Sequence, residues 1–347
     1  MSLGKGGGMQ SSIKDVARLS AVSPKTVSRV INGEPNVTPA TRQRVEAAIA
    51  ALGYVPDHAA RSLRSRHTRT LRLVVVRRFE RFLTEPFLDE VVSGIVDRAA
   101  AAGYALLLEV SGADGGPAWS GVERGRVDGA ILIDGRSASP FLARADRAGG
   151  PWVALPTRPA DPGVGWVYAD FRGGAERVVA HLIERGHRRI VHLAGRLSLP
   201  ERDRSLGYRR ALAAAGIPFD LDLVVAAGHL RHHGYAAMEK ALARGVDFTA
   251  VFAVNDLTAL GAMECLQQRG WSIPADVSVA GFDDIYLARY AAPPLTTVRL
   301  PAYEMGKTAT DLVIETIEGK RERGDGRFFP VELVPRASTG PAPGSAG

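Results

Sequence analysis

The chain has 347 residues, of which 46% are hydrophobic, so it can bury a core and form two or three structural units. Its formal net charge of +7 suits a nucleic acid, an anionic membrane surface or an acidic partner, but no apolar run is long enough to span a membrane. The single cysteine, Cys265, excludes an internal disulfide framework and is typical of a reducing compartment.

The first residues read as a leader. Met1–Gly8 is rich in glycine and lacks the apolar stretch of a signal peptide, and a second methionine follows at Met9. We interpret residues 1–11 as a disordered leader outside the fold, and we expect the protein to be cytoplasmic.

Residues 12–57 are predicted to form a small unit of three helices. Each helix starts with a Ser or Thr whose side chain can accept a hydrogen bond from the free backbone N–H groups of the first turn. The starts are Ser12 with Asp15, Ser23 with Pro24, and Thr38 with Pro39. Apolar residues at helical spacing predict helices over Ile13–Leu19 and Pro24–Ile31, and a third helix that ends at Gly53.

The outward face of the second helix favours DNA as the partner. Once its apolar stripe is buried, the side chains left exposed suit phosphates and base edges in a major groove. They are Lys25, Thr26, Ser28 and Arg29. Between Ile13 and His67 there are nine basic residues and four acidic ones, so positive charge is concentrated at this end of the chain.

After Thr70, nearly continuous apolar strands alternate with amphipathic helices, which indicates parallel sheets covered on both faces. The predicted strands are Leu71–Val76, Ala105–Val110, Ala130–Ile133, Trp152–Leu155, Ile190–Leu193, Val224–Ala226, Ala250–Ala253 and Val277–Ala280. The predicted helices are Phe87–Ala102, Ala175–Arg185, Tyr208–Ala215, Tyr235–Arg244 and Leu257–Arg269. Residues 70–339 are therefore predicted to be an α/β domain of two doubly wound parallel-sheet lobes.

The first unit resembles the helix-turn-helix headpiece of the lac repressor (LacI/GalR) family. The matching residues are Ile13-Lys14-Asp15-Val16-Ala17, Val22-Ser23, Thr26 to Asn32, Thr41-Arg42 and Leu52-Gly53-Tyr54. The resemblance implies a recognition helix from Ser23 to Asn32. The DNA contacts expected in this unit are Lys14, Ser23, Pro24, Lys25, Thr26, Ser28, Arg29 and Asn32. Because proline has no side-chain donor, base choice is expected to fall on Lys25 and Arg29, and the alternative for either is a phosphate contact.

Residues 58–69 are short and basic and resemble the hinge helix of that family. The resemblance implies a segment that folds only on the operator and pairs with its twin in the minor groove. Arg61 is an expected DNA contact. Leu63 matches the apolar wedge that opens the central base step, and the alternative for Leu63 is packing of the linker onto the large domain.

The resemblance extends into the large domain. The matching motifs are Gly186-His187-Arg188-Arg189-Ile190, Gly207-Tyr208-Arg209, Ala253-Val254-Asn255-Asp256, Val277 to Asp284 and Pro294-Leu295-Thr296-Thr297-Val298. They imply a periplasmic-binding-protein-like (type I) fold whose chain crosses between lobes three times. The first lobe is expected to hold about 70–168 and 299–327, and the second about 169–298 and 328–339. The tail, 340–347, is expected to be disordered and has no heptad pattern, so a dimer is favoured over a tetramer.

Ligands of open parallel sheets bind beyond the carboxyl ends of the strands. Asn255 and Asp283 each follow a predicted strand, and Arg204 is expected to open a helix. The resemblance implies that these three residues face the interlobe cleft and bind the effector. The alternative for Asn255 and Asp283 is a helix cap, and Arg202 or Arg196 could replace Arg204.

Two more effector contacts are expected, Phe87 as a stacking wall and Asp170 at a crossover. This chain also departs from the family. Between Gly228 and Gly234, where the family usually places an acidic residue and an aromatic platform, it has His229-Leu230-Arg231-His232-His233, and Arg77-Arg78-Phe79 is unusually basic. An acidic effector therefore stays open beside a sugar. The histidines lack spaced carboxylate or thiol partners, so a solvated loop is expected there rather than a metal site.

Two other classes of protein, an enzyme and a solute-binding protein, fit the sequence less well. Gly306-Lys307-Thr308 echoes a phosphate loop of an enzyme, but Pro301 stands where the first glycine is required. A solute-binding protein would need export instead of a DNA headpiece. The sequence therefore predicts a ligand-responsive transcriptional regulator, a repressor that binds a palindromic operator as a homodimer. Its effector is expected to be a sugar or related metabolite, and no catalytic activity, cofactor, metal or membrane partner is expected.

Overall fold

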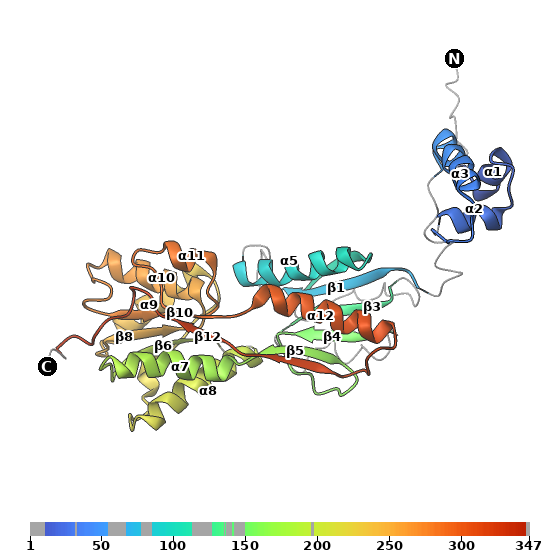
Figure 1. Ribbon diagram of the computed structural model, residues 1–347. Helices are drawn as coiled ribbons and strands as arrows, with labels where there is room; N and C mark the ends of the chain where they lie inside the picture. The colour runs from blue at the N-terminus through green and yellow to red at the C-terminus, as the bar shows by residue number, and fades with distance from the viewer. Residues whose placement is uncertain are drawn as a thin grey trace, which may run out of the picture. The chain divides into compact units, whose positions relative to one another are not determined.

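The computed structural model describes residues 11–31, 33–54, 67–77, 85–112, 127–134, 136, 141, 150–195 and 198–344. The chain divides into two compact units, Met1–Thr68 and Arg69–Gly347, and each is described by itself (Figure 1). Within these described ranges, no helix is both long and apolar enough to cross a membrane.

The first unit consists of helices α1 (Ile13–Leu19), α2 (Pro24–Ile31) and α3 (Pro39–Leu52). The predicted bounds of the first two helices and the predicted end of the third are confirmed. The Asp15 carboxylate accepts the backbone N–H of Ser12 at 3.0 Å, and Gly53 ends α3 in the left-handed region with φ 55°. The buried side chains of the unit come from all three helices: Val16, Ala17, Val27, Val30, Val45 and Ala48.

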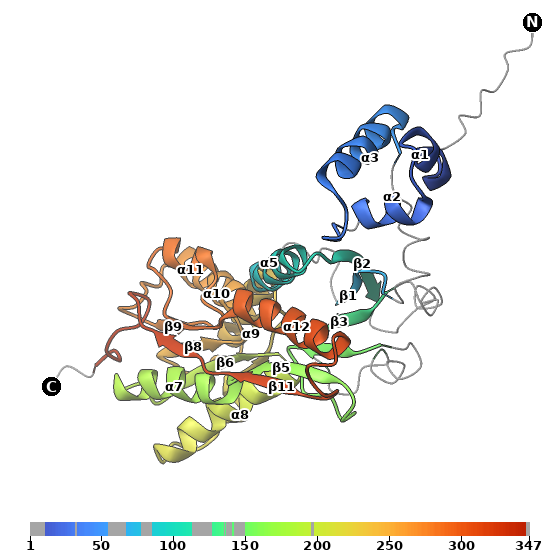
Figure 2. The same ribbon diagram turned by 45° about the vertical axis from the view of Figure 1, so that its right-hand side comes forward.

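The first lobe of the second unit is built on a parallel sheet with the strand order β11-β5-β4-β3-β1-β2. The strands are β1 (Thr70–Arg77), β2 (Ala105–Gly112), β3 (Gly129–Ile133), β4 (Trp152–Leu155), β5 (Gly165–Ala169) and β11 (Gly326–Phe329). Helices α5 (Pro86–Ala101) and α12 (Ala302–Ile317) lie side by side against this sheet (Figures 1 and 2).

Two glycines allow α5 and α12 to touch through their backbones. A Cβ atom at Gly94 would lie 2.1 Å from the carbonyl oxygen of Tyr303, and one at Gly306 would lie 2.1 Å from that of Val91. Any side chain at these positions would force the helices apart. Gly306, which belongs to the motif that echoes a phosphate loop, therefore serves helix packing.

The second lobe has a parallel sheet with the order β7-β6-β8-β9. The strands are β6 (Ile190–Ala194), β7 (Val224–Ala226), β8 (Ala250–Ala253) and β9 (Ser278–Ala280). One face is covered by α7 (Phe171–Glu184) and α8 (Leu199–Ala214), and the other by α9 (Arg231–Ala243) and α10 (Asp256–Gln268) (Figure 1). Both lobes thus show the predicted α/β class with parallel sheets, and in the second lobe helices cover both faces of the sheet.

The remaining elements are short ones within the second lobe and those on the path between the lobes. In the second lobe, a 3-10 turn, η4 (Leu221–Leu223), precedes β7, and helix α11 (Tyr286–Tyr290) follows β9. Strand β10 (Thr297–Arg299) then leads to α12 and β11 of the first lobe, and the chain returns through β12 (Glu332–Val334), which pairs with β10 in antiparallel fashion.

All the strands predicted in the second unit are present, but other elements were missed. They are β5, β10, β11, β12, η4, α11 and α12. The prediction that α8 begins at Tyr208 was wrong, because the helix begins at Leu199. Its first turns bury charged side chains, so the apolar periodicity of an ordinary helix is absent. The capping pair of Ser198 and Glu201 is the local signal that marks this start.

Candidate functional site

Helix α2 presents two cations to solvent in the first unit. Lys25 is exposed, and the Arg29 side chain is 42% exposed, with its Nε 3.5 Å from a Glu34 carboxylate oxygen. Val27 and Val30 turn the opposite side of the helix into the core. Because the apolar side is fixed inward, the cationic side must face any partner of this helix.

The other predicted DNA contacts are spread over α1 and α2. Ser23 and Thr26 act at the start of α2, because the Ser23 hydroxyl oxygen accepts the Thr26 N–H at 3.1 Å and lies 2.9 Å from the Thr26 hydroxyl. Lys14 and Pro24 are exposed and Ser28 is half-buried. The predicted contacts Asn32, Arg61 and Leu63 lie outside the described residues.

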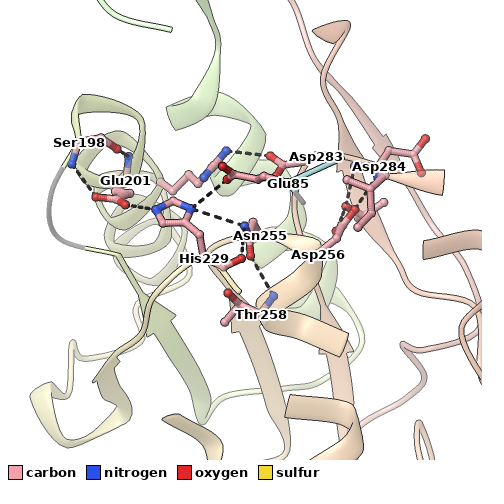
Figure 3. A network of polar contacts seen from close by, with 12 residues as sticks. Glu85, Ser198, Glu201, His229, Asn255, Asp256, Thr258, Asp283 and Asp284 are labelled. Carbon is pink, nitrogen blue, oxygen red and sulfur yellow. Dashed lines mark hydrogen bonds and ion pairs between the residues drawn. The ribbon is translucent and has the colours of Figure 1, made fainter. Parts of the chain in front are cut away.

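In the second unit, a group of polar side chains gathers where the parallel strands end. We call it the strand-end cluster, and it consists of Glu85, Glu201, Arg204, His229, Asn255 and Asp283 (Figure 3). His229, Asn255 and Asp283 follow β7, β8 and β9, and all three strands point the same way. Three of the predicted effector residues, Arg204, Asn255 and Asp283, are therefore brought together.

A buried ion pair lies at the centre of the cluster. Arg204 Nη2 donates to Asp283 Oδ1 at 2.9 Å, and the two side chains are only 6% and 8% exposed. The guanidinium carbon of Arg204 lies 4.3 Å from the ring centre of Phe282 and 5.0 Å from that of Phe171. Its Nε is buried and has no hydrogen-bond partner in the described structure. Such a donor is available to a ligand.

Asp283 occupies an unusual environment. Burial raises the pKa of its carboxyl to about 7, although the positive charge of Arg204 opposes the rise. Its backbone has φ 114°, and Asp284 follows with φ 55°, both in the left-handed region that disfavours side chains. Residues held in such a conformation cluster at binding sites. Asp256 stabilises the turn at Asp283 and Asp284, because its carboxylate accepts the N–H of Ile285 at 2.9 Å.

Asn255 caps a helix and also reaches into the cluster. Its Oδ1 accepts the Thr258 N–H at 2.9 Å at the start of α10, while its Nδ2 donates to the carbonyl oxygen of His229 at 3.0 Å. The helix-cap alternative considered for this residue therefore holds, and the same amide also positions the loop after β7.

His229 is not solvated, contrary to the expectation for its loop. Its side chain is 18% exposed, Nε2 contacts Glu201 Oε1, and Nδ1 lies 3.9 Å from Glu85 Oε1. Burial opposes a charge on the imidazole, but the hydrogen bond that Nε2 donates to Glu201 and the charges of Glu201 and Glu85 outweigh it, so the pKa of His229 is raised. Across the described ranges, no three His, Cys, Asp or Glu side chains are arranged to hold a metal ion.

Two predicted effector residues lie apart from this hydrogen-bonded group. Phe87, near the start of α5, lines a pocket of about 230 Å³ that Asp283 and Tyr303 also line. Asp170 caps α7 by accepting the Gly173 N–H at 2.9 Å. Arg202, an alternative to Arg204, is exposed, and Arg196 and Arg78-Phe79 lie outside the described residues.

Comparisons with known proteins cover both units. Residues 12–57 match the family described as bacterial regulatory proteins, lacI family, and residues 179–339 match a periplasmic binding protein-like domain. The HTH-type transcriptional regulator CelR of Thermobifida fusca is 38% identical over 331 residues, which are 92% of this chain and 94% of that protein.

Solved structures agree with these matches. A complex of the transcriptional regulator CelR with cellobiose has a TM-score of 0.73 and 35% identity, and covers 95% of this chain and 100% of that one. The lac repressor dimer bound to operator and the anti-inducer ONPF has a TM-score of 0.84 and 28% identity, and covers 96% and 100%. The resemblance found from sequence motifs thus extends over nearly the whole chain.

Proposed function

Because the chain belongs to the lacI family of bacterial regulatory proteins, we propose that it is a transcriptional repressor whose operator affinity is controlled by a small molecule bound between its lobes. One observation carries the proposal. The same chain joins an exposed cationic helix, α2, to a buried Arg204–Asp283 pair at the strand ends of a two-lobed α/β unit. We propose that the protein acts in the cytoplasm, where operator DNA is found, and we assign it no catalytic step or cofactor.

On the DNA side, two copies of α2 read the two halves of a palindromic operator. Each helix lies in a major groove, where Lys25 and Arg29 can donate to guanine acceptors or to phosphates. Ser23 and Thr26 stabilise the start of the helix. Lys14 and Ser28 add polar contacts. The hinge residues Arg61 and Leu63 are proposed to act in the minor groove between the half-sites.

On the effector side, the charges of the cluster favour a neutral ligand. The cations Arg204 and His229 are already faced by the carboxylates of Asp283, Glu201 and Glu85. An acidic effector would meet these carboxylates, whereas sugar hydroxyls can both donate to them and accept from Arg204. The structure of CelR with cellobiose shows that a relative binds a sugar. We therefore propose a sugar effector, with cellobiose as the first probe and Phe87 and Asn255 as further contacts.

The proposal is tested by selecting binding sites for the full chain from a random DNA pool at two salt concentrations, without and with cellobiose. We expect enrichment of a palindrome, a steep loss of affinity with salt, and a changed affinity when a sugar effector is present. Recovery of no sequence preference under any of these conditions would contradict the proposal.

The dimer is proposed to form through apolar side chains that the chain leaves exposed. Leu108 and Val110 on β2 are 50% and 36% exposed, and they lie on one face of the strand because successive side chains of a strand point to opposite faces. A lone chain rarely leaves neighbouring large apolar side chains exposed without a partner. We expect Leu108→Glu to produce monomers in analytical ultracentrifugation and to weaken operator binding strongly, because two headpieces no longer bind together.

A matched control is Leu221→Glu, which introduces the same charge at another exposed leucine. Leu221 lies in η4 and is 68% exposed. This variant is expected to stay dimeric and to keep operator affinity. If both variants behave alike, β2 does not form the dimer interface.

A further inference from the structure

One imidazole contacts carboxylates from both lobes. Glu85 is the residue before α5 in the first lobe, whereas Glu201 lies in the first turn of α8 and His229 follows β7, both in the second lobe. His229 Nδ1 is 3.9 Å from Glu85 Oε1, and its Nε2 contacts Glu201 (Figure 3). The ring therefore spans the division between the lobes.

The two ring nitrogens differ in how firmly their protons are held. Glu201 is 1% exposed, and its other oxygen accepts the Ser198 N–H at 2.5 Å, so this carboxylate is fixed against Nε2. Nε2 therefore keeps its proton, and the proton that the imidazolium loses is the one on Nδ1.

Loss of that proton exchanges one partner for another. A protonated Nδ1 attracts the Glu85 carboxylate of the first lobe. A bare Nδ1 carries a lone pair that repels a carboxylate, but it can accept a hydrogen bond from Asn255 Nδ2, which lies 3.5 Å away in the second lobe. One protonation state thus favours a contact between lobes and the other a contact within one lobe.

Charged groups from several elements set the balance. The pKa of His229 is shifted by the charges of Glu201 and Arg204 in α8 and of Glu85 before α5. The charge of His229 in turn lowers the pKa of His233 in α9 and of Asp283 after β9. Burial and Arg204 disfavour the imidazolium, but Glu201 and Glu85 favour it more strongly, so the pKa of His229 is raised above its ordinary value. The bridge is therefore formed below that pKa and broken above it.

We propose that the Nδ1 proton of His229 is a lock between the two lobes: when it is present the ring attracts Glu85 of the first lobe, and when it is absent this contact between the lobes is lost. The inference rests on the proposed function, because it adds a dependence on pH to effector-controlled operator binding. Because the coupling is reciprocal, a ligand or contact that brings the lobes together also favours the protonated form of His229.

The first test is direct titration of His229 by NMR in the full chain, with its ring signals assigned by their absence from His229→Gln. We expect Glu85→Gln to lower the pKa of His229 by about one, because it removes an opposite charge that approaches the ring. The control Glu90→Gln alters an exposed carboxylate of α5 and is expected to leave that pKa unchanged. An equal pKa of His229 in the wild type and Glu85→Gln would overturn the proposal.

The second test follows operator affinity between about pH 5.5 and 8.5, the range in which histidines titrate. In the wild type we expect a change of up to about tenfold, centred on the pKa of His229 and absent from His229→Gln. His232→Gln, which alters an exposed neighbouring histidine, is expected to keep the wild-type profile. A wild-type profile in His229→Gln would overturn the lock. If no variant binds any operator, the proposed function fails instead, and the NMR titration still decides whether the bridge exists.

Discussion

Replacing Arg204 with methionine should abolish the response of operator binding to effector and lower the free energy of unfolding by about 3 kcal/mol. Methionine retains the packing between Phe171 and Phe282 but removes the charge that faces Asp283. It also removes the buried Nε donor that we assign to the effector. Operator binding with and without the effector measures the response, and urea unfolding measures the stability.

The loss of stability should depend on pH in a defined direction. The pKa of Asp283 is raised by burial to about 7 even beside Arg204, and it should rise further in Arg204→Met. A carboxyl whose folded pKa exceeds its unfolded pKa binds more protons in the folded state, so the free energy of unfolding falls as pH rises toward the folded value. The difference in free energy of unfolding between the wild type and the variant should therefore be larger at about pH 8 than at about pH 5.

Two further variants separate binding from folding. Arg202→Met removes an exposed arginine from the same helix and should leave both stability and effector response unchanged. Arg204→Met with Asp283→Asn removes both charges, keeps a residue that tolerates the positive φ of this position, and should regain stability without regaining the response. A normal effector response in Arg204→Met would exclude Arg204 from the effector site and return Arg196 to consideration.

Removing the cations of α2 should weaken operator binding by about 1 to 3 kcal/mol for each side chain that reads a base. Arg29→Ala and Lys25→Ala each remove one cation from the solvent-facing side of the helix and leave the core side chains Val27 and Val30 in place. Affinity for the selected operator and for point-substituted operators, measured by fluorescence anisotropy, is the appropriate readout.

The pattern of weakening distinguishes a base contact from a phosphate contact. Removal of a residue that reads a base should relax discrimination at one operator position, whereas removal of a phosphate contact should weaken binding to all sequences alike and reduce the salt dependence. Arg44→Ala, which removes an exposed charge from α3, is the matched control and should have a small effect. If neither α2 variant weakens operator binding more than this control does, α2 is not the recognition helix.

Local signals predicted the first unit well. The starts at Ser12, Ser23 and Thr38 and the stop at Gly53 act within one helical turn, so they could be read directly from the sequence. Most buried strands of the second unit were equally visible as short apolar runs, but β5 was missed although most of its residues are buried. Strands β10, β11 and β12 were not visible in this way: Val298 is the single apolar residue of β10, and β11 and β12 consist of exposed or half-buried residues.

The candidate effector site was predicted in part. Asn255 and Asp283 could be found because parallel strands end at a common edge, and the family motif drew attention to Arg204. His229 was interpreted as part of a solvated loop, since no partner stands near it in the sequence. Its partner Glu201 comes from helix α8, and its partner Glu85 comes from the first lobe.

The sequence by itself determined the two-unit organisation, the α/β class of the large unit, the membership in the lacI family and the outward face of α2. These properties depend on helix caps, apolar periodicity and motifs, whose physical effect extends over only a few residues. The tertiary structure alone decided which polar groups share the strand-end cluster and how the charges of Arg204, Asp283, His229, Glu201 and Glu85 are paired. Their pKa values and partners depend on burial and on distances between distant parts of the chain, which only the folded backbone sets.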